Sequence, residues 1–365
     1  MKSDNHSYLS RLDHLRFVAA IIVILHHCKG KLPYPQELNG VVDFIKVWLI
    51  GGSTGVSLFL VLSGFIFCVI SNGGEKEINY KKFIKNRILR IAPLVIFLFF
   101  ILITVGRQKF SPIDILRVLT LQMNTGNTYT GWGDNIYPIG GMWTIAVEFQ
   151  FYLIFPFLIS FFHKKGWAYF AKLVLLMIFI KFTLLESYGI RTINDIYHTI
   201  IGRLDQFLIG IIAGWLYLKN KHKNKHPVAG IALILISFTL LTALLFYSLK
   251  ANIYLLSLKF TLEAIFWSSI TYCYVTLNLS INKTIDSTLS YLGGLSFSMY
   301  LLHIPLNKFI YSAFMTYPKD SATTLINGII YLIPLTILVS SVTYSLIERP
   351  FLEMRVKYIE KPKYD

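Results

Sequence analysis

Long apolar runs dominate the pattern of hydrophobic and polar positions along this chain. A helix that crosses a bilayer needs ~20 mainly apolar residues, so a run of that length predicts such a helix. By this rule the sequence predicts about ten helices, of which the third is the shortest and is expected to tilt or to run on. Their ranges are 12–29, 48–70, 91–105, 141–162, 167–186, 200–218, 227–249, 254–279, 289–314 and 324–347. We therefore predict an all-α fold, a polytopic membrane helix bundle.

The connections between the apolar runs differ in charge, and every second one is strongly basic. Lysine and arginine accumulate in loops that face the cytoplasm, which assigns the basic connections to that side. The tail after the last run is also basic, so both termini are predicted to be cytoplasmic. The basic residues concerned are Lys81, Lys82, Lys85, Arg87 and Arg90; Lys164 and Lys165; Lys219, Lys221, Lys223 and Lys225; and Arg349, Arg355, Lys357, Lys361 and Lys363.

The longest connection on the other side, residues 106–140, is rich in Gly, Asn and Thr. These residues favour turns, and we expect the connection to fold over the outer mouth of the bundle. At the other end of the sequence, a charged segment runs up to the first apolar stretch without a small-residue cleavage site, which favours a retained first helix over a signal peptide. We expect one transmembrane domain, residues 1–350, followed by a short cytoplasmic tail, residues 351–365.

Composition agrees with a membrane protein and argues against other classes. Hydrophobic residues make up 55% of the chain and charged residues 15%, and the mean hydropathy is +0.57, as in chains made mostly of buried apolar segments. The formal net charge of +16 could indicate a nucleic-acid partner, but the basic residues lie between the membrane runs and form no module of their own. We expect no nucleic-acid binding.

The three cysteines lie in three different apolar runs, at Cys28, Cys68 and Cys273. This distribution is typical of small buried residues rather than of a disulfide framework or a set of metal ligands. We expect no metal site.

Arg16 and His27 lie inside the first apolar run, on one face of the predicted helix. At ~100° and 1.5 Å per residue, their spacing separates the two side chains by roughly 16 Å along the helix, about half of a bilayer core. Ionisable groups inside a membrane are costly, so each is a candidate functional residue. The pair suggests chemistry that is conducted across the membrane.

A series of motifs accompanies this pair in a fixed order along nearly the whole chain. They are DHLRFVAAIIVILHH from Asp13, GVSLFLVLSGF from Gly55, RILRIAP with Arg87 and Arg90, MWTIAVEFQFY with Glu148, GRLDQFLIG with Arg203 and Asp205, SFSMYLLHIPL with His303, and ERPF at Glu348. In these motifs the chain resembles the acyltransferase-3 family, membrane-embedded enzymes that transfer acyl groups, often acetyl, to sugars of bacterial surface polysaccharides.

The resemblance implies that an acyl-thioester donor enters from the cytoplasm, that its pantetheine arm reaches through the bundle, and that the acceptor is modified at the outer face. Two positions depart from the family pattern: Met142 stands where relatives often have Ser, and Ser57 where an acidic residue is common. The soluble hydrolase-like domain that some relatives append is not among these residues, so we expect the membrane domain to handle the acceptor.

His27 is the candidate catalytic base, because imidazole titrates near neutral pH and can take the hydroxyl proton of an acceptor. Glu148 is the candidate carboxylate that orients the imidazole, with Asp205 and Glu263 as alternatives. His303 could donate a hydrogen bond to an oxyanion, serve as a second proton-transfer site, or be a buried hydrogen-bonded histidine.

Arg16, Arg87 and Arg90 are the candidate ligands for the phosphates of acetyl-CoA. The i, i+3 spacing of Arg87 and Arg90 puts both guanidiniums on one helix face, which suits a fork-shaped grip, although both could be topological anchors. Substrate contacts are assigned to Trp143, Arg203 and Asp205. The GVSLFLVLSGF stretch could serve either close helix packing or passage of a pantetheine arm.

The sequence thus favours a membrane O-acyltransferase of the bacterial cytoplasmic (inner) membrane, with membrane lipids, acyl-CoA and a polysaccharide or lipid-linked glycan as partners. The acceptor, whether O-antigen, exopolysaccharide or another glycan, is not encoded in these motifs. A secondary transporter or flippase remains an alternative, in which the same intramembrane ionisable residues form a pathway. Against it, the chain has no duplicated half with matched Gly or Pro interruptions.

Overall fold

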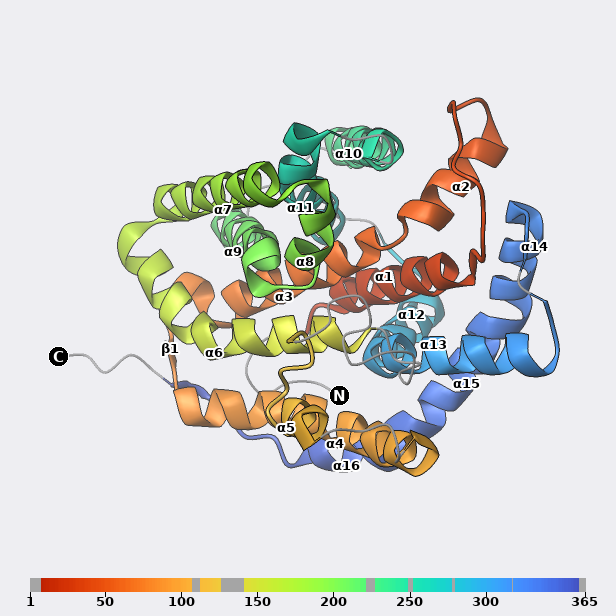
Figure 1. The fold of residues 1–365 in the computed structure, drawn as a ribbon. Coiled ribbons are helices and arrows are strands. Elements are labelled where there is room, and N and C mark those ends of the chain that lie inside the picture. Colours follow the sequence, from red (N-terminus) through yellow and green to blue (C-terminus); the bar gives the residue numbers. More distant parts are fainter. Residues whose placement is uncertain are drawn as a thin grey trace.

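In a computed structural model of the chain, the described residues are 8–106, 112–125, 141–220, 227–248, 252–277, 280–316 and 318–360, and they are mostly helical (Figure 1). The helices are α1 (Ser10–Cys28), α2 (Val41–Gly51), α3 (Thr54–Ile70), α4 (Tyr80–Gly106), α5 (Pro112–Leu119), α6 (Met142–Lys165), α7 (Trp167–Tyr188), α8 (Ile193–Tyr197), α9 (Ile200–Asn220), α10 (Pro227–Ser248), α11 (Ile253–Thr276), α12 (Lys283–Gly294), α13 (Ser296–Ala313), α14 (Ser321–Ile326), α15 (Ile333–Thr343) and α16 (Arg349–Glu353). The other described elements are the 3-10 helices η1 (Asn72–Gly74) and η3 (Ile190–Thr192), the π-helical segments η4 (Asn327–Leu332) and η5 (Tyr344–Glu348), and the strands β1 (Glu77–Ile78) and β2 (Ile359–Glu360).

The all-α membrane bundle predicted from the sequence is confirmed. Among the described residues, 7 helices are long and apolar enough to cross a membrane, or up to 8 if the bent pair α2–α3 is one span. Every range predicted from the apolar runs overlaps a helix or a helix pair, but two of these ranges fall outside the set of 7 or 8: α1, which carries charged side chains, and the range 289–314, which is divided between α12 and α13. The chain is a multi-pass membrane protein; the count of ten spans and the cytoplasmic location of the termini stay predictions.

Helix α3 lies at the centre of the bundle and packs against α1, α9 and α11 (Figure 1). Its glycines permit this packing. A Cβ on Gly55 would stand 2.7 Å from the Ala19 carbonyl oxygen of α1, and a Cβ on Gly64 would stand 2.2 Å from the Phe207 carbonyl oxygen of α9. No larger residue fits at either place, and small residues are what allow membrane helices to approach closely. The glycines of the GVSLFLVLSGF stretch therefore serve helix packing, while Phe59, Leu60 and Ser63 of the same stretch line a cavity.

Two of the predicted single helices are broken in the structure. The range 48–70 divides into α2 and α3, which are bent by 60° at the break. Gly52 lies at this break, and a Cβ on it would stand 2.8 Å from the Ile22 carbonyl oxygen of α1. The range 289–314 divides into α12 and α13 at Leu295, just after Gly293, whose would-be Cβ stands 2.0 Å from the Asp13 carbonyl oxygen. Both breaks fit the chain against α1.

Helix α4 begins well before its predicted range of 91–105. The basic residues that the sequence analysis placed in a loop form its first turns instead, starting at Tyr80. Asn79 explains the early start, because its Oδ1 accepts a hydrogen bond from the Lys82 backbone N–H at 3.1 Å, as a helix N-cap does. The apolar criterion missed these turns because they are polar.

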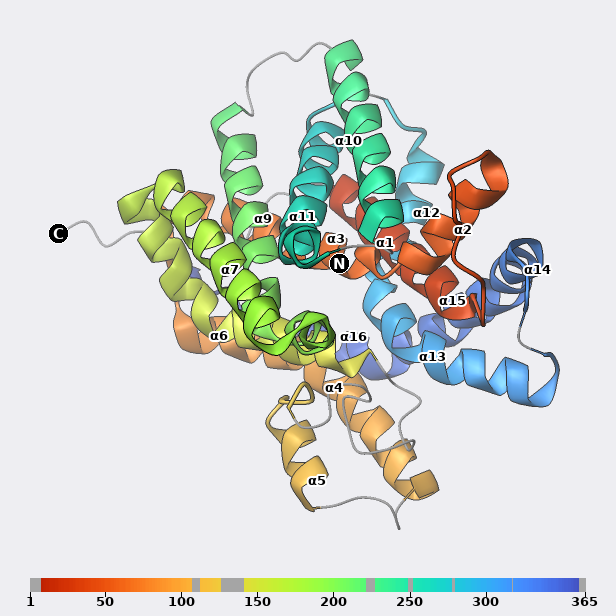
Figure 2. The same cartoon turned by 45° about the horizontal axis from the view of Figure 1, so that its top comes forward.

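Several chain segments meet at one end of the bundle. There η1 packs against α6 and α9, α16 packs against α4, and β2 pairs antiparallel with β1. This end, which we call the basic end, exposes Lys81, Lys82, Lys85, Lys164, Lys165 and Lys219. In the long connection after α4, α5 lies beside α4 (Figure 2), and the Gly-, Asn- and Thr-rich residues 126–140 lie outside the described residues.

Candidate active site

A cavity of about 500 Å³ opens among α1, α3, α4, α6, α12, α13 and the C-terminal segment. Volumes of roughly 300–1,000 Å³ are typical of small-molecule sites. Its lining brings together four residues that the sequence analysis singled out separately: Arg16, Arg87, Arg90 and Glu148. The first three are the proposed donor ligands, and they share one space although they come from two helices. We call this space the basic cavity.

Two of the cavity arginines already have carboxylate partners. An Arg16 Nη1 hydrogen donates to Asp13 Oδ1 at 2.6 Å. Arg90 Nη1 lies 3.4 Å from an oxygen of Glu348, a fully buried carboxylate that also accepts a hydrogen bond from Ser298. The charge of Arg90 thus stabilises a buried carboxylate of the ERPF motif, which ties α4 to the last helical segment.

Arg87 differs, because aromatic rings surround it. Its guanidinium carbon lies 5.2–6.0 Å from the ring centroids of Phe67, Phe83, Tyr152 and Tyr358. Within the described residues no carboxylate pairs with Arg87, and its buried Nε has no hydrogen-bond partner. Cation–π contacts hold the guanidinium in place without neutralising it, so its charge is available to an anion in the cavity.

Glu148 lines the basic cavity beside Tyr152, one of the rings around Arg87. Its Oε1 accepts hydrogen bonds from Ser63 Oγ at 2.9 Å and from the Tyr152 hydroxyl. The sequence analysis expected this carboxylate to orient His27, but the hydrogen bonds described for His27 go to other groups. Glu148 belongs to the cavity rather than to the imidazole.

His27 pairs instead with His303, a residue of α13. His303 Nε2 lies 3.1 Å from His27 Nδ1, and the same Nδ1 lies 2.9 Å from the Val23 carbonyl oxygen. Because a carbonyl only accepts, these neighbours assign the proton of neutral His27 to Nδ1 and make His303 Nε2 an acceptor. His27 Nε2 is then left with a free lone pair, as a general base requires.

This arrangement bears on the roles considered for His303. With Nε2 accepting from His27, that nitrogen carries no proton for an oxyanion, and a positioning or proton-transfer role fits the geometry better. His303 is fully buried, whereas the side chain of His27 is exposed at the end of α1. Asn307, one helical turn beyond His303, donates to the His27 carbonyl oxygen at 2.8 Å and was missed by sequence reasoning, although its i, i+4 spacing from His303 was a usable signal.

An aromatic wall stands between the basic cavity and this histidine pair. Tyr300 and Phe59 line the cavity and pack edge to face, with ring centroids 5.9 Å apart. The Tyr300 ring also lies 5.7 Å from the His303 ring. The cavity therefore ends one aromatic side chain away from the histidines.

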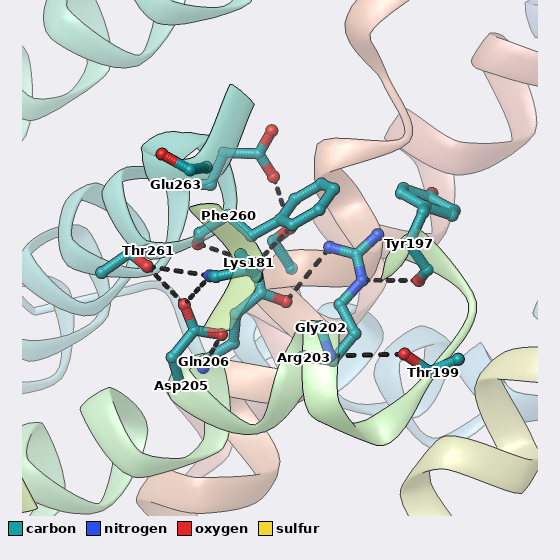
Figure 3. Close-up of polar contacts among 12 residues, drawn as sticks. Lys181, Tyr197, Thr199, Gly202, Arg203, Asp205, Gln206, Phe260, Thr261 and Glu263 are labelled. Carbon is teal, nitrogen blue, oxygen red and sulfur yellow. Dashed lines mark hydrogen bonds and ion pairs between the residues drawn. The ribbon is translucent and has the colours of Figure 1, made fainter. Parts of the chain in front are cut away.

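Arg203 lies in a separate buried cluster (Figure 3). Its guanidinium carbon lies 3.9 Å from the Tyr197 ring centroid, 4.1 Å from that of Phe260 and 5.5 Å from that of Trp143. Its Nε donates to the Tyr197 carbonyl oxygen at 2.9 Å, and Nη1 donates to the Gln206 side chain at 3.3 Å. The structure thus joins two of the proposed substrate ligands, Arg203 and Trp143, apart from the basic cavity.

Asp205, the third proposed substrate ligand, is engaged inside the bundle. Lys181 Nζ donates to Asp205 Oδ2 at 2.6 Å and to Thr261 Oγ1 at 3.1 Å, and all three side chains are fully or almost fully buried (Figure 3). The ammonium group of Lys181, on α7, therefore compensates the charge of the buried Asp205 carboxylate. Asp205 does not contact His27, so it does not supply the orienting carboxylate.

The unusual residue Ser57 lies beside a second buried carboxylate. Ser57 Oγ donates to Glu263 and accepts from Gln206 Nε2 at 3.0 Å. Glu263, the other alternative considered for His27, is therefore one hydrogen bond away from the position where an acidic residue is common in the family that the motifs suggest.

Comparison with known proteins agrees with this arrangement. A family model described as "Acyltransferase domain" matches residues 9–346, nearly the whole chain. The chain belongs to the acyltransferase domain family. All the motifs found in the sequence except ERPF lie within the matched range, and their residues form the basic cavity, the histidine pair and the Arg203 cluster. No solved structure matches the chain significantly.

Curated proteins that are similar to this chain are named as O-acetyltransferases. "Putative O-acetyltransferase SACOL0978" of Staphylococcus aureus (strain COL) is 26% identical over 388 residues, which cover 98% of this chain and 59% of that protein. "O-acetyltransferase OatA" of Staphylococcus aureus (strain NCTC 8325 / PS 47) is 25% identical over 374 residues, covering 94% of this chain and 57% of that protein. The chain thus spans a little over half the length of these relatives.

Two cavity residues of this acyltransferase domain were not among the sequence-based candidates. Arg355 and Tyr358, from the segment after α16, both line the basic cavity. Burial lowers the pKa of Arg355 to about 10, helped by the nearby charges of Arg90 and Arg87, and burial raises the pKa of the Tyr358 hydroxyl. Sequence reasoning assigned this segment to a tail because no apolar run follows α16. Within the described residues, no cluster of His, Cys, Asp and Glu has the makings of a metal site.

Proposed function

We propose that this protein transfers an acetyl group from cytoplasmic acetyl-CoA to a hydroxyl group of a cell-surface or lipid-linked polysaccharide. The observation that carries the proposal is the basic cavity, which collects Arg16, Arg87 and Arg90 near the basic end and closes beside the histidine pair. The O-acetyltransferase names of the relatives support the acetyl group and the oxygen acceptor. We place the protein in the bacterial cytoplasmic membrane.

The donor is the first part of this proposal. Acetyl-CoA carries several phosphate charges, and guanidiniums bind phosphates through charge-assisted, often bidentate hydrogen bonds. By the positive-inside rule, the basic residues at the same end favour a cytoplasmic location for it, and the cytoplasm is where acetyl-CoA is made. Its pantetheine arm would run along the apolar part of the cavity toward Tyr300, and its thioester toward His27.

The chemistry assigned to His27 follows from its tautomer. The acceptor oxygen attacks the thioester carbonyl carbon while its proton passes to His27 Nε2; the C–S bond then breaks, and the departing CoA sulfur takes up the proton. His303 Nε2 stabilises the imidazolium of His27 by accepting a hydrogen bond from His27 Nδ1. Direct attack by the acceptor and a prior transfer of the acetyl group to His27 use the same imidazole.

The acceptor would approach from the end opposite to the basic end, where His27 is exposed. Trp143, at the start of α6, is buried among Tyr197, His198 and Arg203, so we assign it to shaping the acceptor region rather than to stacking on a sugar ring. Asp205, paired with Lys181, contributes to this region by holding α9 to α7 rather than by contact with sugar.

Thioester turnover tests the proposal. The purified protein in detergent, given acetyl-CoA and a glycan acceptor, is expected to release free CoA and to form one O-acetyl ester for each CoA released. A transporter that uses the same ionisable residues would release none. Absence of acceptor-dependent CoA release, with a range of glycans and with the protein folded, would contradict the proposal.

A further inference from the structure

The segment that follows the last helix folds back onto the bundle. Asn86 of α4 fixes it with two hydrogen bonds: Asn86 Nδ2 donates to the Val356 carbonyl oxygen at 2.6 Å, and the Val356 N–H donates to Asn86 Oδ1 at 3.0 Å. The Asn79 N–H donates to the Tyr358 carbonyl oxygen at 2.9 Å, and Ile359 pairs with Ile78 between β2 and β1. Residues 354–360, here called the C-terminal strap, therefore form part of the cavity wall.

The C-terminal strap brings a further arginine to the basic cavity. Arg355 lines the cavity, and its Nε donates to the Leu352 carbonyl oxygen at 3.0 Å, which fixes the side chain against α16. Within the part of the chain that the structure describes, no carboxylate pairs with it. The nearest described acid on α16, Glu353, is bound to Arg349 instead, at 2.9 Å.

Arg355 and Arg87 thus form a pair of guanidiniums without acidic partners. Both line the basic cavity, and the Arg87 guanidinium carbon lies 6.0 Å from the ring centroid of Tyr358, a residue of the C-terminal strap. Burial lowers the pKa of Arg355, and the charges of Arg90 and Arg87 both help to lower it. Two like charges that face one space repel each other unless an anion lies between them. Arg90, by contrast, is paired with Glu348.

We propose that Arg355 of the C-terminal strap, together with Arg87, holds the phosphates of the acyl-CoA donor, and that Arg90 acts as a tie to Glu348. This inference rests on the proposed function, because it assumes a phosphate-bearing donor. It replaces the i, i+3 fork of Arg87 and Arg90 with a clamp built from α4 and the strap. The strap is then a part of the donor site rather than a tail.

Donor binding by the full-length protein in detergent tests this clamp. Isothermal titration with CoA compares the unchanged protein, Arg355→Gln, Arg355→Lys and Lys357→Gln. Lys357→Gln is the matched control, since it removes the same charge from an exposed side chain two residues away on the same strap. A charge-assisted hydrogen bond corresponds to roughly a tenfold change in affinity or more. We expect a loss of about that size for Arg355→Gln, a smaller loss for Arg355→Lys, and none for Lys357→Gln.

The same titration with pantetheine, which lacks the phosphates, separates contact from folding. All four proteins should bind pantetheine alike, because the clamp would touch only the nucleotide part. Equal CoA affinities for Arg355→Gln and Lys357→Gln, with the unchanged protein binding CoA, would overturn the clamp and leave the proposed function standing. Failure of the unchanged protein to bind CoA at all would overturn both.

A phospholipid headgroup is another phosphate source at this depth of the membrane. Mixed micelles containing phosphatidylglycerol distinguish it. If CoA is the ligand, added phosphatidylglycerol leaves the tenfold difference between Arg355→Gln and the control unchanged. If the lipid abolishes CoA binding to the unchanged protein while Arg355→Gln no longer binds the lipid, the strap is a lipid site and the proposal is wrong.

Discussion

His303 Nε2 lies 3.1 Å from His27 Nδ1, although 276 residues separate the two histidines in the sequence. The contact decides which nitrogen of His27 can act. Because Val23 and His303 both accept from Nδ1, the proton-accepting nitrogen is Nε2. In the proposed transfer, the base His27 would therefore be oriented by a histidine rather than by a carboxylate.

Replacing His27 by Ala should abolish acetylation of surface glycan while the protein stays inserted in the membrane. His26→Gln is the control, because His26 faces α2, where its Nδ1 contacts the Leu49 carbonyl oxygen at 3.0 Å. Mass analysis of glycans from cells that carry each variant provides the readout. Acetylation that persists in His27→Ala would remove His27 from the mechanism.

Replacing His303 by Leu should slow turnover without changing the apparent affinity for acetyl-CoA. The imidazolium of His27 would lose one hydrogen-bond acceptor, worth roughly a factor of ten to a hundred in rate. His303→Gln retains an acceptor and should recover part of the loss. If Leu and Gln behave alike and both lower the thermal midpoint, His303 has a packing role only.

Arg87→Gln and Arg90→Gln should have different effects. The charge of Arg87 is unpaired within the described residues, so its loss should raise the KM for acetyl-CoA more than that for the glycan. Loss of Arg90 leaves Glu348 buried without its partner, and this should lower the thermal midpoint more than it raises the KM for the donor. Unchanged donor KM in Arg87→Gln would return Arg87 to a topological role.

Sequence reasoning reached the helices and the cavity arginines because both leave local signals. Apolar runs mark the helices, and Arg16, Arg87, Arg90 and Glu148 stand out as polar groups in or beside them. The start of α4 was missed because its first turns are polar, although Asn79 is a recognisable N-cap.

The contacts that give these residues their roles were not accessible in the same way. The pairing of His27 with His303, and that of Asp205 with Lys181, depend on how distant helices dock. Helix docking follows from close approaches such as Gly64 against α9, which the sequence shows only as a small residue. The C-terminal strap was assigned to a tail because no apolar periodicity marks a segment held by backbone hydrogen bonds.

Lys181→Met should destabilise the protein strongly, since it leaves Asp205 buried and unpaired. Removing one partner of a buried ion pair costs about 3–5 kcal/mol, whereas replacing both by apolar residues is often close to neutral. The double variant Lys181→Met with Asp205→Leu should therefore recover most of the stability, as measured by unfolding in detergent. A double variant that is stable but has lost affinity for the acceptor would instead make Asp205 a substrate ligand.

Binding of CoA should be nearly independent of pH from about 7 to 9 and should weaken as the pH rises through about 10, where Arg355 loses its proton. The sign follows from the lowered pKa: below it the guanidinium is charged and attracts phosphate, and above it the charge is absent. The ionisable groups that face Arg355 are Arg87, Arg90, Tyr344 and Tyr358. Titration with a sulfur-free CoA analogue avoids ionisation of the thiol. In Arg355→Gln this decline should disappear; an identical decline in both proteins would contradict the assignment.

Sidedness is the most direct test of an acyl transfer that crosses the membrane. The protein is reconstituted in one orientation in sealed vesicles, with acetyl-labelled acetyl-CoA supplied only at the basic end and an impermeant glycan only at the opposite side. We predict that label appears on the glycan while all free CoA remains with the donor. Transfer that occurs only when donor and glycan share a side would contradict the account.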